Sequence, residues 1–316
     1  MNKSLRVVSL LPSATETLTV ISKAAASLLV GRSHEDDYPK SITHLPILTG
    51  SRIQFTAAEV DKQVSSEIGS GRSLYNLDVE MLKSLKPDIV LTQDLCEVCA
   101  IDLVTVERVA KQMNPIPNII SLNPQSLDEV LNDILVVSRA IGMEEAGSKC
   151  WSDLTQRIQT AVGRADKFLA SSQRKNVAFI EWSDPIFIGG HWTPQLIHMA
   201  GGSHPLNPTK NATSGAGKSF RITHEQLVAS KPEVLIIAPC GLNLEETKRE
   251  TALLQAMPVW QQLKKTVTQV ALVDGNAFFN RPGPRLVDAL EFLVGYLTNS
   301  VETIPETFTW EEIKSF

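Results

Sequence analysis

The sequence lacks the features that mark several specialised classes of protein. It has four cysteines in 316 residues, too few for a disulfide-stabilised scaffold. No apolar run reaches the roughly 18 residues that a membrane-spanning helix needs. The net charge of −5 argues against a nucleic-acid-binding protein. What remains, with 43% hydrophobic and 21% charged residues, is typical of a globular protein of about two domains.

Common catalytic signatures are also missing. We find no Ser-His-Asp order, no paired-carboxylate signature and no glycine-rich cofactor loop. The stretch SGAGKS, at 214–219, resembles the end of a phosphate-binding loop, but that motif requires glycine where this chain has Ala212. We therefore expect a protein that is not an enzyme and that uses no catalytic cofactor.

The longest helical pattern lies in the middle of the chain, at 144–172. Apolar residues recur there every three or four positions, and no proline interrupts them. At 1.5 Å per residue such a helix is roughly 40 Å long, enough to connect two lobes. Its opposite face is charged, and we expect the following residues to face solvent: Glu145, Lys149, Asp153, Arg157 and Arg164.

The segments on either side of this helix repeat each other. EMLKSLKPDIVLTQ, which starts at Glu80, matches EQLVASKPEVLIIA, which starts at Glu225, an offset of 145 residues. Each copy is typical of a short helix, a Lys-Pro turn and a buried parallel strand. We predict an α/β fold with two Rossmann-like lobes, residues 1–143 and 173–316. One long rigid helix joins them, and a ligand cleft lies between them.

Aromatic residues occur in the loops that we expect at the carboxyl ends of the strands. Ligands of open parallel sheets bind beyond those ends, and aromatic side chains suit a large flat ligand. The alternative is that these side chains only cover the surface of each lobe. The aromatic candidates are Tyr38, Trp182, Trp192, Phe278 and Phe279.

Cysteine and histidine also occur at the predicted strand ends. Cys96 and Cys99 form a Cys-x-x-Cys pair, and the repeat offset places Cys240 beside Cys96. Such a pair fits a redox centre, half of a metal site or a chance spacing. With His34 and His191 on neighbouring loops, a site for zinc or another soft metal is a hypothesis, although unreactive thiols explain the pattern better.

Glu80 and Glu225 occupy equivalent positions in the repeat, each near the start of a helix. The helix dipole alone favours a carboxylate there. The functional alternative is a matched pair of surface acids, one on each lobe, that docks a basic partner with two-fold symmetry.

Motifs along most of the chain resemble one known family. This is the helical-backbone (class III) substrate-binding proteins of ABC importers, and the similarity is strongest to the members that bind cobalamin (vitamin B12). Other members bind haem, ferric siderophores or metal ions. The matching stretches span residues 6–298: RVVSLLPSATETL, VGRSHEDDYP, LKPDIVLTQ, HWTPQLIHMAGG, ITHEQLVASKPEVLII and GNAFFNRPGPRLVDAL.

The resemblance implies that cobalamin or a related corrinoid lies between the lobes, and that Glu80 and Glu225 dock a dimeric ABC permease. Two alternatives stay open. The chain could bind a metal ion or a metal chelate through cysteine and histidine, or it could be a redox or corrinoid-processing enzyme that uses the Cys-x-x-Cys pair, which the importer proteins lack. The ligand-binding candidates, by position, are Tyr38, Gln93, Asp94, Trp182, His191, Trp192, Phe278, Phe279, Asn280 and Arg281.

The first residues of the chain indicate the cellular compartment in which we expect the protein. Pro12 and Glu16 interrupt its apolar stretch, so we expect no secretory signal. We expect a cytoplasmic monomer without membrane insertion, or a periplasmic or other extracytoplasmic protein if a leader has been removed. In the cytoplasm the two glutamates would not meet a permease, and we would expect them to be retained only as helix-start residues.

Overall fold

The computed structural model describes residues 4–51, 75–94, 103–209 and 214–314. The chain forms two compact units, and each unit consists of two separate segments of the sequence. Unit 1 comprises Met1–Pro124 and Asn132–Trp151, and unit 2 comprises Gln125–Leu131 and Ser152–Phe316. The boundaries between the units therefore fall inside two helices, α6 (Leu127–Ala140) and α7 (Glu144–Leu169). The predicted lobe boundaries lie instead near the two ends of α7.

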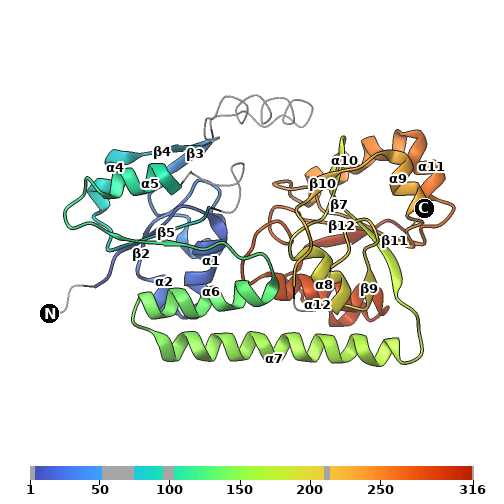
Figure 1. Cartoon of the computed structure of the whole chain (residues 1–316), viewed down its shortest axis with the longest axis horizontal. Coiled ribbons are helices and arrows are strands. Elements are labelled where there is room, and N and C mark those ends of the chain that lie inside the picture. Colours follow the sequence, from blue (N-terminus) through green and yellow to red (C-terminus); the bar gives the residue numbers. More distant parts are fainter. Residues whose placement is uncertain (1–3, 52–74, 95–102, 210–213, 315–316) are drawn as a thin grey trace. The chain divides into compact units, whose positions relative to one another are not determined.

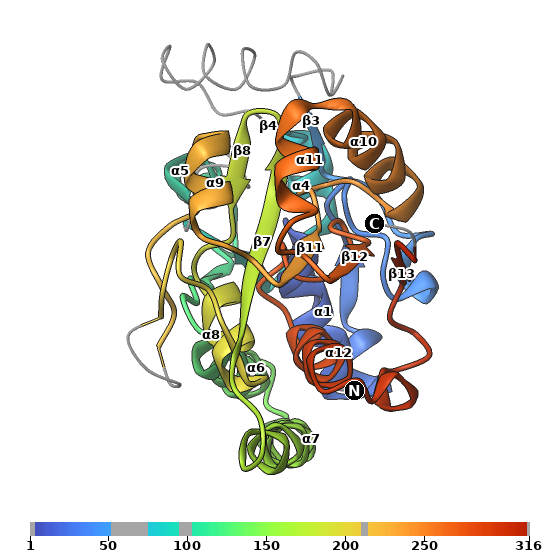
Figure 2. The ribbon, with the colours of Figure 1, turned by 90° about the vertical axis from the view of Figure 1, so that its right-hand side faces the viewer.

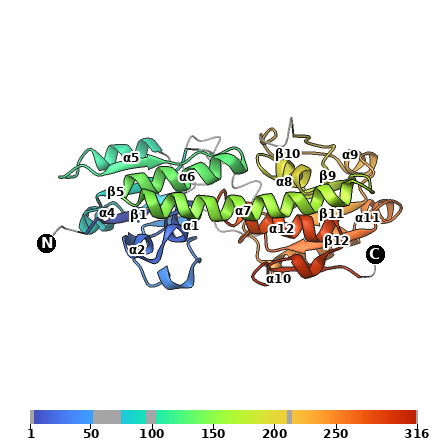
Figure 3. The same ribbon diagram turned by 90° about the horizontal axis from the view of Figure 1, so that it is seen from below.

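The predicted long helix is confirmed as α7, a single uninterrupted helix of 26 residues (Figure 1). Its predicted apolar stripe is turned inward, with Leu154, Ala161 and Ala165 buried. In unit 1, α6 and α7 lie side by side (Figure 3). Their approach requires glycine at Gly147, because a Cβ atom there would lie 2.0 Å from Ser138 Oγ.

Arg157, which we expected on the solvent-facing side of α7, is instead half-buried in an ion-pair network. Its guanidinium donates to the carboxylates of Asp288 and Glu291, with Nε 3.0 Å and Nη2 2.6 Å from the two Glu291 oxygens. Both partners lie on α12 (Leu286–Leu297). A bidentate arginine–carboxylate pair is strong and directional, so this network fixes α7 to α12 within unit 2.

Unit 1 is built on a four-stranded parallel sheet in the order β2-β1-β5-β6, with a separate antiparallel pair β3-β4. The chain alternates strands and helices, as the sequence predicts for a parallel sheet. Besides parts of α6 and α7, its elements are β1 (Val7–Ser9), α1 (Pro12–Ile21), α2 (Lys23–Ala26), β2 (Leu29–Gly31), the 3-10 turn η1 (Lys40–Ile42), β3 (Thr49–Ser51), β4 (Tyr75–Leu77), α4 (Val79–Leu85), β5 (Ile89–Thr92), α5 (Leu103–Ala110) and β6 (Asn118–Ser121).

The core of unit 1 follows from the apolar strands. Val8 and Val90 pack on one face of the sheet against Leu82 of α4 and against Val106 and Val109 of α5. The β1 and β5 strands are buried along their whole length, as continuous apolar runs in parallel sheets are when helices cover both faces.

Unit 2 contains a larger, mixed sheet in the order β10-β8-β7-β11-β12-β13, with β9 pairing to β7. Its centre, β7-β11-β12, is parallel, and β8, β10 and β13 join antiparallel. The elements are β7 (Lys175–Ser183), β8 (Ile186–Ile188), α8 (Thr193–Met199), β9 (Gly202–Ser203), β10 (Phe220–Arg221), α9 (His224–Ala229), β11 (Val234–Ile237), α10 (Leu244–Ala256), α11 (Pro258–Leu263), β12 (Gln269–Val273), α12, the 3-10 turn η2 (Val301–Thr303) and β13 (Trp310–Glu312).

The central strands of unit 2 lie between α9, α10 and α11 above and α8 and α12 below (Figure 2). Their alternate residues contribute to two cores. Ile180, Leu235 and Leu272 belong to the cluster that also contains the apolar residues of α9, α10 and α11. On the opposite face Phe179 contacts Phe279, with ring centroids 4.8 Å apart, and that aromatic cluster continues into α12. The period-two alternation of a strand distributes its side chains in this way.

The predicted repeat is confirmed in the structure. Strands β5 and β11 start and end at positions 145 residues apart, and each is flanked by parallel neighbours. Lys86 and Lys231, also 145 residues apart, both adopt a left-handed backbone, with φ of 44° and 48°. The α/β fold class is thereby confirmed, whereas the ligand cleft between the lobes stays a prediction.

The left-handed lysines provide a test of this fold. A side chain in that conformation costs about 1–2 kcal/mol, which exceeds the roughly 0.5–1 kcal/mol entropic disadvantage of glycine. Lys231→Gly should therefore raise the free energy of unfolding by about 0.5–1 kcal/mol. The control Ala229→Gly, at an ordinary helical position, should lower it. Urea denaturation measures both, and a lower stability for Lys231→Gly would contradict the assignment of strain.

Candidate functional site

The loop after β2 is held in place by its own buried polar groups. Arg32 Nη1 donates hydrogen bonds to the carbonyl oxygens of Ser33 and Asp36, both at 3.0 Å, and Nη2 donates to Thr43 O at 2.7 Å. The Asp36 carboxylate accepts from the Ser33 N–H at 3.0 Å and from the Thr15 hydroxyl at 2.7 Å. Because these groups are buried, their hydrogen bonds leave the loop little freedom.

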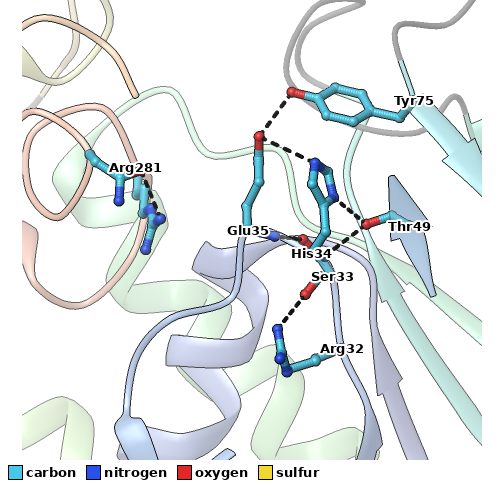
Figure 4. Close-up of polar contacts among 8 residues, drawn as sticks. Arg32, Ser33, His34, Glu35, Thr49, Tyr75 and Arg281 are labelled. Atoms are coloured by element: carbon cyan, nitrogen blue, oxygen red, sulfur yellow. Dashed lines mark hydrogen bonds and ion pairs between the residues drawn. The ribbon is translucent and has the colours of Figure 1, made fainter. Parts of the chain in front are cut away.

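The next residues of this loop form a polar cluster with the β3-β4 pair (Figure 4). His34 Nδ1 lies 2.7 Å from Thr49 Oγ1, and the His34 N–H donates to the same oxygen at 3.0 Å. His34 Nε2 lies 3.9 Å from Glu35 Oε1, which accepts a hydrogen bond from the Tyr75 hydroxyl at 3.2 Å. Burial lowers the pKa of His34, although the Glu35 carboxylate opposes this shift. Of the residues in this cluster, the sequence analysis named only His34 as a candidate site residue.

The other candidates of unit 1 differ in exposure. Tyr38 has 47% of its surface exposed. Gln93, just after β5, is buried, and its Oε1 has no hydrogen-bond partner among the described residues. Asp94 is exposed, and its backbone N–H donates to Asn123 Oδ1 at 2.6 Å. Cys96 and Cys99, the predicted metal or redox pair, lie outside the described residues.

In unit 2 the end of β7 carries Glu181 and Trp182. The Glu181 carboxylate accepts hydrogen bonds from the Ser219 side chain and the Gly190 N–H, but burial outweighs them and raises its pKa to about 7. A Cβ atom on Gly190 would lie 2.2 Å from Ser219 N, so only glycine permits this close approach. Trp182 is half-buried, and its Nε1 donates to Asp184 O at 3.2 Å.

Three of the predicted aromatic contacts lie in the core of unit 2. Phe279 is fully buried between Phe179 and Phe292. Phe278 and Trp192 are almost fully buried, and Trp192 Nε1 donates to Phe279 O. Their burial argues against direct contact with a ligand, and we assign them a packing role instead. Phe278 also has the Arg285 guanidinium 5.3 Å from its ring centroid, an intramolecular cation–π contact.

The remaining candidates of unit 2 hold its loops together. Asn280 Nδ2 donates to Ala238 O at 3.0 Å and to Gly275 O at 2.8 Å, which ties the loop after β12 to the end of β11. The half-buried Arg281 donates from Nη2 to Asn276 Oδ1 at 3.0 Å.

His191 has a left-handed backbone with φ of 52°, and its Nδ1 lies 2.9 Å from Gln125 Oε1. Burial, and then the charge of Lys218, lower its pKa. Cys240 is exposed. Within the described ranges, no three or more His, Cys, Asp and Glu side chains gather closely enough to hold a metal ion. The predicted metal set includes Cys96 and Cys99, which lie outside the described residues, so that set stays a prediction.

The two repeat-equivalent glutamates are both exposed in the first turn of a short helix. The Glu80 side chain is 88% exposed and lies 3.5 Å from Lys83 Nζ. Its helix is capped by Asp78, and that of Glu225 by a capping box of Thr223 and Gln226. A hydrogen bond from Thr223 is the main cause that lowers the pKa of Glu225.

Two units built from one repeat, each with its candidate loops at the carboxyl edge of a parallel sheet, have the architecture of class III substrate-binding proteins. A family profile described as "Periplasmic binding protein" matches residues 45–272, more than half of the chain. The chain therefore belongs to the periplasmic binding protein family. It is a non-catalytic substrate-binding protein of the ABC-importer type, which confirms that it is not an enzyme.

Individual relatives cover almost all of the chain. The vitamin B12-binding protein of Vibrio cholerae is 22% identical over 295 residues, 92% of this chain and 88% of that protein. The structure is similar to that of a periplasmic heme-binding protein from Pseudomonas aeruginosa, with a TM-score of 0.68, 18% identity and 94% of each chain covered. It is also similar to the vitamin B12-binding protein BtuF of V. cholerae, with a TM-score of 0.63, 20% identity, and 94% and 98% of the two chains covered.

Family membership corrects one expectation. The members of this family are periplasmic binding proteins, so the cytoplasmic assignment is wrong. Without that assignment, nothing prevents the two glutamates from meeting a permease. No helix in the described part of the chain is both long and apolar enough to cross a membrane.

The raised pKa of Glu181 predicts how stability depends on pH. Its ordinary value is 4.5 and the folded value is about 7, so between these values the folded state binds more protons than the unfolded state. Stability contributed by the protonated form is therefore lost as the pH rises through about 7. Glu181→Gln stays neutral, so its melting temperature should exceed that of the wild type by more at pH 8 than at pH 5. The exposed control Glu306→Gln should show no such difference, and equal pH profiles for all three proteins would contradict the assignment.

Proposed function

We propose that this chain binds a metal tetrapyrrole, with cobalamin or a related corrinoid as the first candidate and haem as the second. The observation that carries this proposal is the near full-length similarity to proteins named for these two ligands. The corrinoid comes first because the sequence relative is a vitamin B12-binding protein. Haem has equal support among the similar structures, one of which is described in complex with two hemes.

The strand ends of both units offer suitable contacts for such a ligand. Tyr38 is exposed and Trp182 is half-buried, so both retain aromatic surface that a flat macrocycle can cover. Arg281, which Asn276 orients, offers N–H donors to the side-chain amides of a corrinoid or a cation to the propionates of haem. Glu181 is the nearest carboxyl to Trp182 in sequence, and its raised pKa limits the charge that it presents at neutral pH.

Absorption titrations test the ligand class and separate the two candidates. We expect a shift of the Soret or corrin bands that saturates near one equivalent of hydroxocobalamin, cyanocobalamin or hemin. Full burial of a large apolar side chain contributes about 1.5–3 kcal/mol, so Trp182→Ala or Tyr38→Ala should weaken binding about tenfold or more. Trp151→Ala, at an exposed tryptophan of α7, is the matched control. The proposal fails if no corrinoid or haem changes either the spectrum or the melting temperature.

We also propose that Glu80 and Glu225 dock an ABC permease. Both are exposed, both occupy the first turn of a capped helix, and the two positions are equivalent in the repeat. Well-placed carboxylate–arginine contacts contribute about 1.5–3 kcal/mol each. Such contacts would form with arginines of the permease.

The double variant Glu80→Ala with Glu225→Ala should lose co-purification with the cell's own corrinoid or haem permease, while its ligand affinity stays unchanged. The control removes two other exposed glutamates, one from a helix of each unit, as Glu107→Ala with Glu245→Ala. Equal recovery of the permease by the wild type and both double variants would exclude this docking role.

A further inference from the structure

Asn207 joins two loops of unit 2, residues 189–192 after β8 and residues 214–219 before β10. Its side chain is buried, and its Nδ2 donates hydrogen bonds to one carbonyl oxygen of the first loop at 3.1 Å and to two of the second loop at 3.3 Å. One amide group therefore connects both loops to the turn at 204–207. The three acceptors are Gly189 O, Gly217 O and Lys218 O.

The two loops are also in direct contact with each other. The His191 N–H donates to Gly217 O at 2.9 Å, and the Ala216 N–H donates to His191 O at 2.6 Å. A Cβ atom on Gly190 would lie 2.2 Å from Ser219 N. The loops therefore form one structural piece next to the end of β7, and Asn207 holds that piece to the rest of the unit.

His204 fixes the turn that carries Asn207. The Asn207 N–H donates to His204 O at 3.2 Å, and His204 Nδ1 lies 2.8 Å from Val177 O on β7. Because a carbonyl oxygen can only accept, Nδ1 carries the proton of the neutral ring. The residue is 4% exposed, and Nε2 makes no hydrogen bond within the described part of the chain.

Protonation of His204 is therefore unfavourable in the folded protein. It would place a second N–H, and a positive charge, on a buried nitrogen that has no acceptor. Burial lowers the pKa of His204, although the carbonyl groups of Val177 and Gly189 oppose this shift. Since the folded pKa lies below the ordinary value of 6.5, the stability that the neutral ring contributes is present above that value and is lost as the pH falls through the folded pKa.

The charged groups on the surrounding elements do not offset this cost. Burial and two carbonyl groups, and no charged side chain of the described residues, determine the pKa shift of His204. The acidic groups nearby bond elsewhere, Glu181 to Ser219 and Gly190, and Glu233 to the Asn176 N–H. The other titratable or charged residues on these elements are Arg174 and Lys175 at the start of β7, His198 of α8, and His191 and Lys218 in the two loops.

We propose that His204 is an acid-sensitive latch for the binding edge of unit 2. In its neutral form it holds the turn at 204–207, and Asn207 then holds the two loops together. On protonation the ring leaves its buried position, and the loops loosen. Periplasmic binding proteins lie outside the cytoplasmic membrane, where the pH follows that of the medium. The latch itself needs no ligand, whereas its effect on ligand affinity rests on the proposed tetrapyrrole function.

Hydrogen exchange followed by mass spectrometry tests the latch on the whole chain without ligand. The amides of His191 and Ala216 bond from loop to loop, so the peptides that contain them report loosening. After correction for the intrinsic exchange rate, their exchange in the wild type should rise about threefold or more from pH 7 to pH 5. His204→Gln keeps an N–H donor but cannot be protonated, and it should abolish the rise. Asn207→Ala should raise exchange at both pH values.

Two other histidines serve as controls. His44→Gln, at an exposed residue of unit 1, and His191→Gln, within the first loop, should both retain the rise in acid. Glu181 responds to pH in the opposite sense, so a Glu181→Gln background should show a rise at least as large. If thermal melts show that His204→Gln is unfolded, His204→Leu replaces it. Equal exchange of the wild type at both pH values would overturn the proposal, as would a rise that persists without His204 or disappears in His191→Gln.

Titration with cyanocobalamin separates this inference from the proposed function. We expect the affinity of the wild type to fall from pH 7 to pH 5 and that of His204→Gln to stay constant. A chain that binds neither cyanocobalamin nor hemin would refute the tetrapyrrole proposal, while the exchange data would still decide on the latch. An affinity that ignores pH, alongside exchange that rises in acid, would overturn the link between the latch and ligand binding.

Discussion

The fold of each unit depends on one short strand that is buried on both faces. β5 and β11 are each four fully buried residues. Their backbone groups cannot bond to water, so a parallel neighbour on each side must satisfy them. This constraint aligns the carboxyl ends of three strands at one edge of each sheet. The loops that leave that edge are then free to vary, and the candidate binding residues of both units are found there.

Features that depend on periodicity or repetition were predictable from the sequence. The apolar spacing of α7 and the offset of 145 residues between β5 and β11 follow from local patterns, and the structure contains both. The direction of a loop side chain does not follow from such patterns. Phe279 lies in a polar, glycine-rich stretch, which resembles a binding loop. It nevertheless packs against Phe179, which lies 100 residues earlier in the sequence, and against Phe292 of α12.

The polar cluster of His34, Glu35 and Tyr75 in unit 1 is a second feature that local sequence patterns do not predict. His34 and Glu35 are adjacent in sequence, but Tyr75 lies 40 residues further along the chain than Glu35. The pairing of β3 with β4 brings Tyr75 to them, and a three-residue strand carries almost no periodic signal. Arg157 is similar, because its helical position predicts a solvent-facing side chain and only the packing of α12 supplies its two acidic partners. Long-range polar contacts of this kind cannot be predicted from a single sequence.

Three unfavourable local features occur together near the carboxyl end of β7 in unit 2. Glu181 keeps a carboxyl in a site that disfavours its charge, His191 has a left-handed backbone, and Gly190 is crossed by Ser219 with no room for a side chain. Stability alone would favour an apolar residue over a glutamate whose surroundings disfavour its charge. Retaining such costs at one edge is typical of functional sites, which supports that edge as the binding surface of this unit.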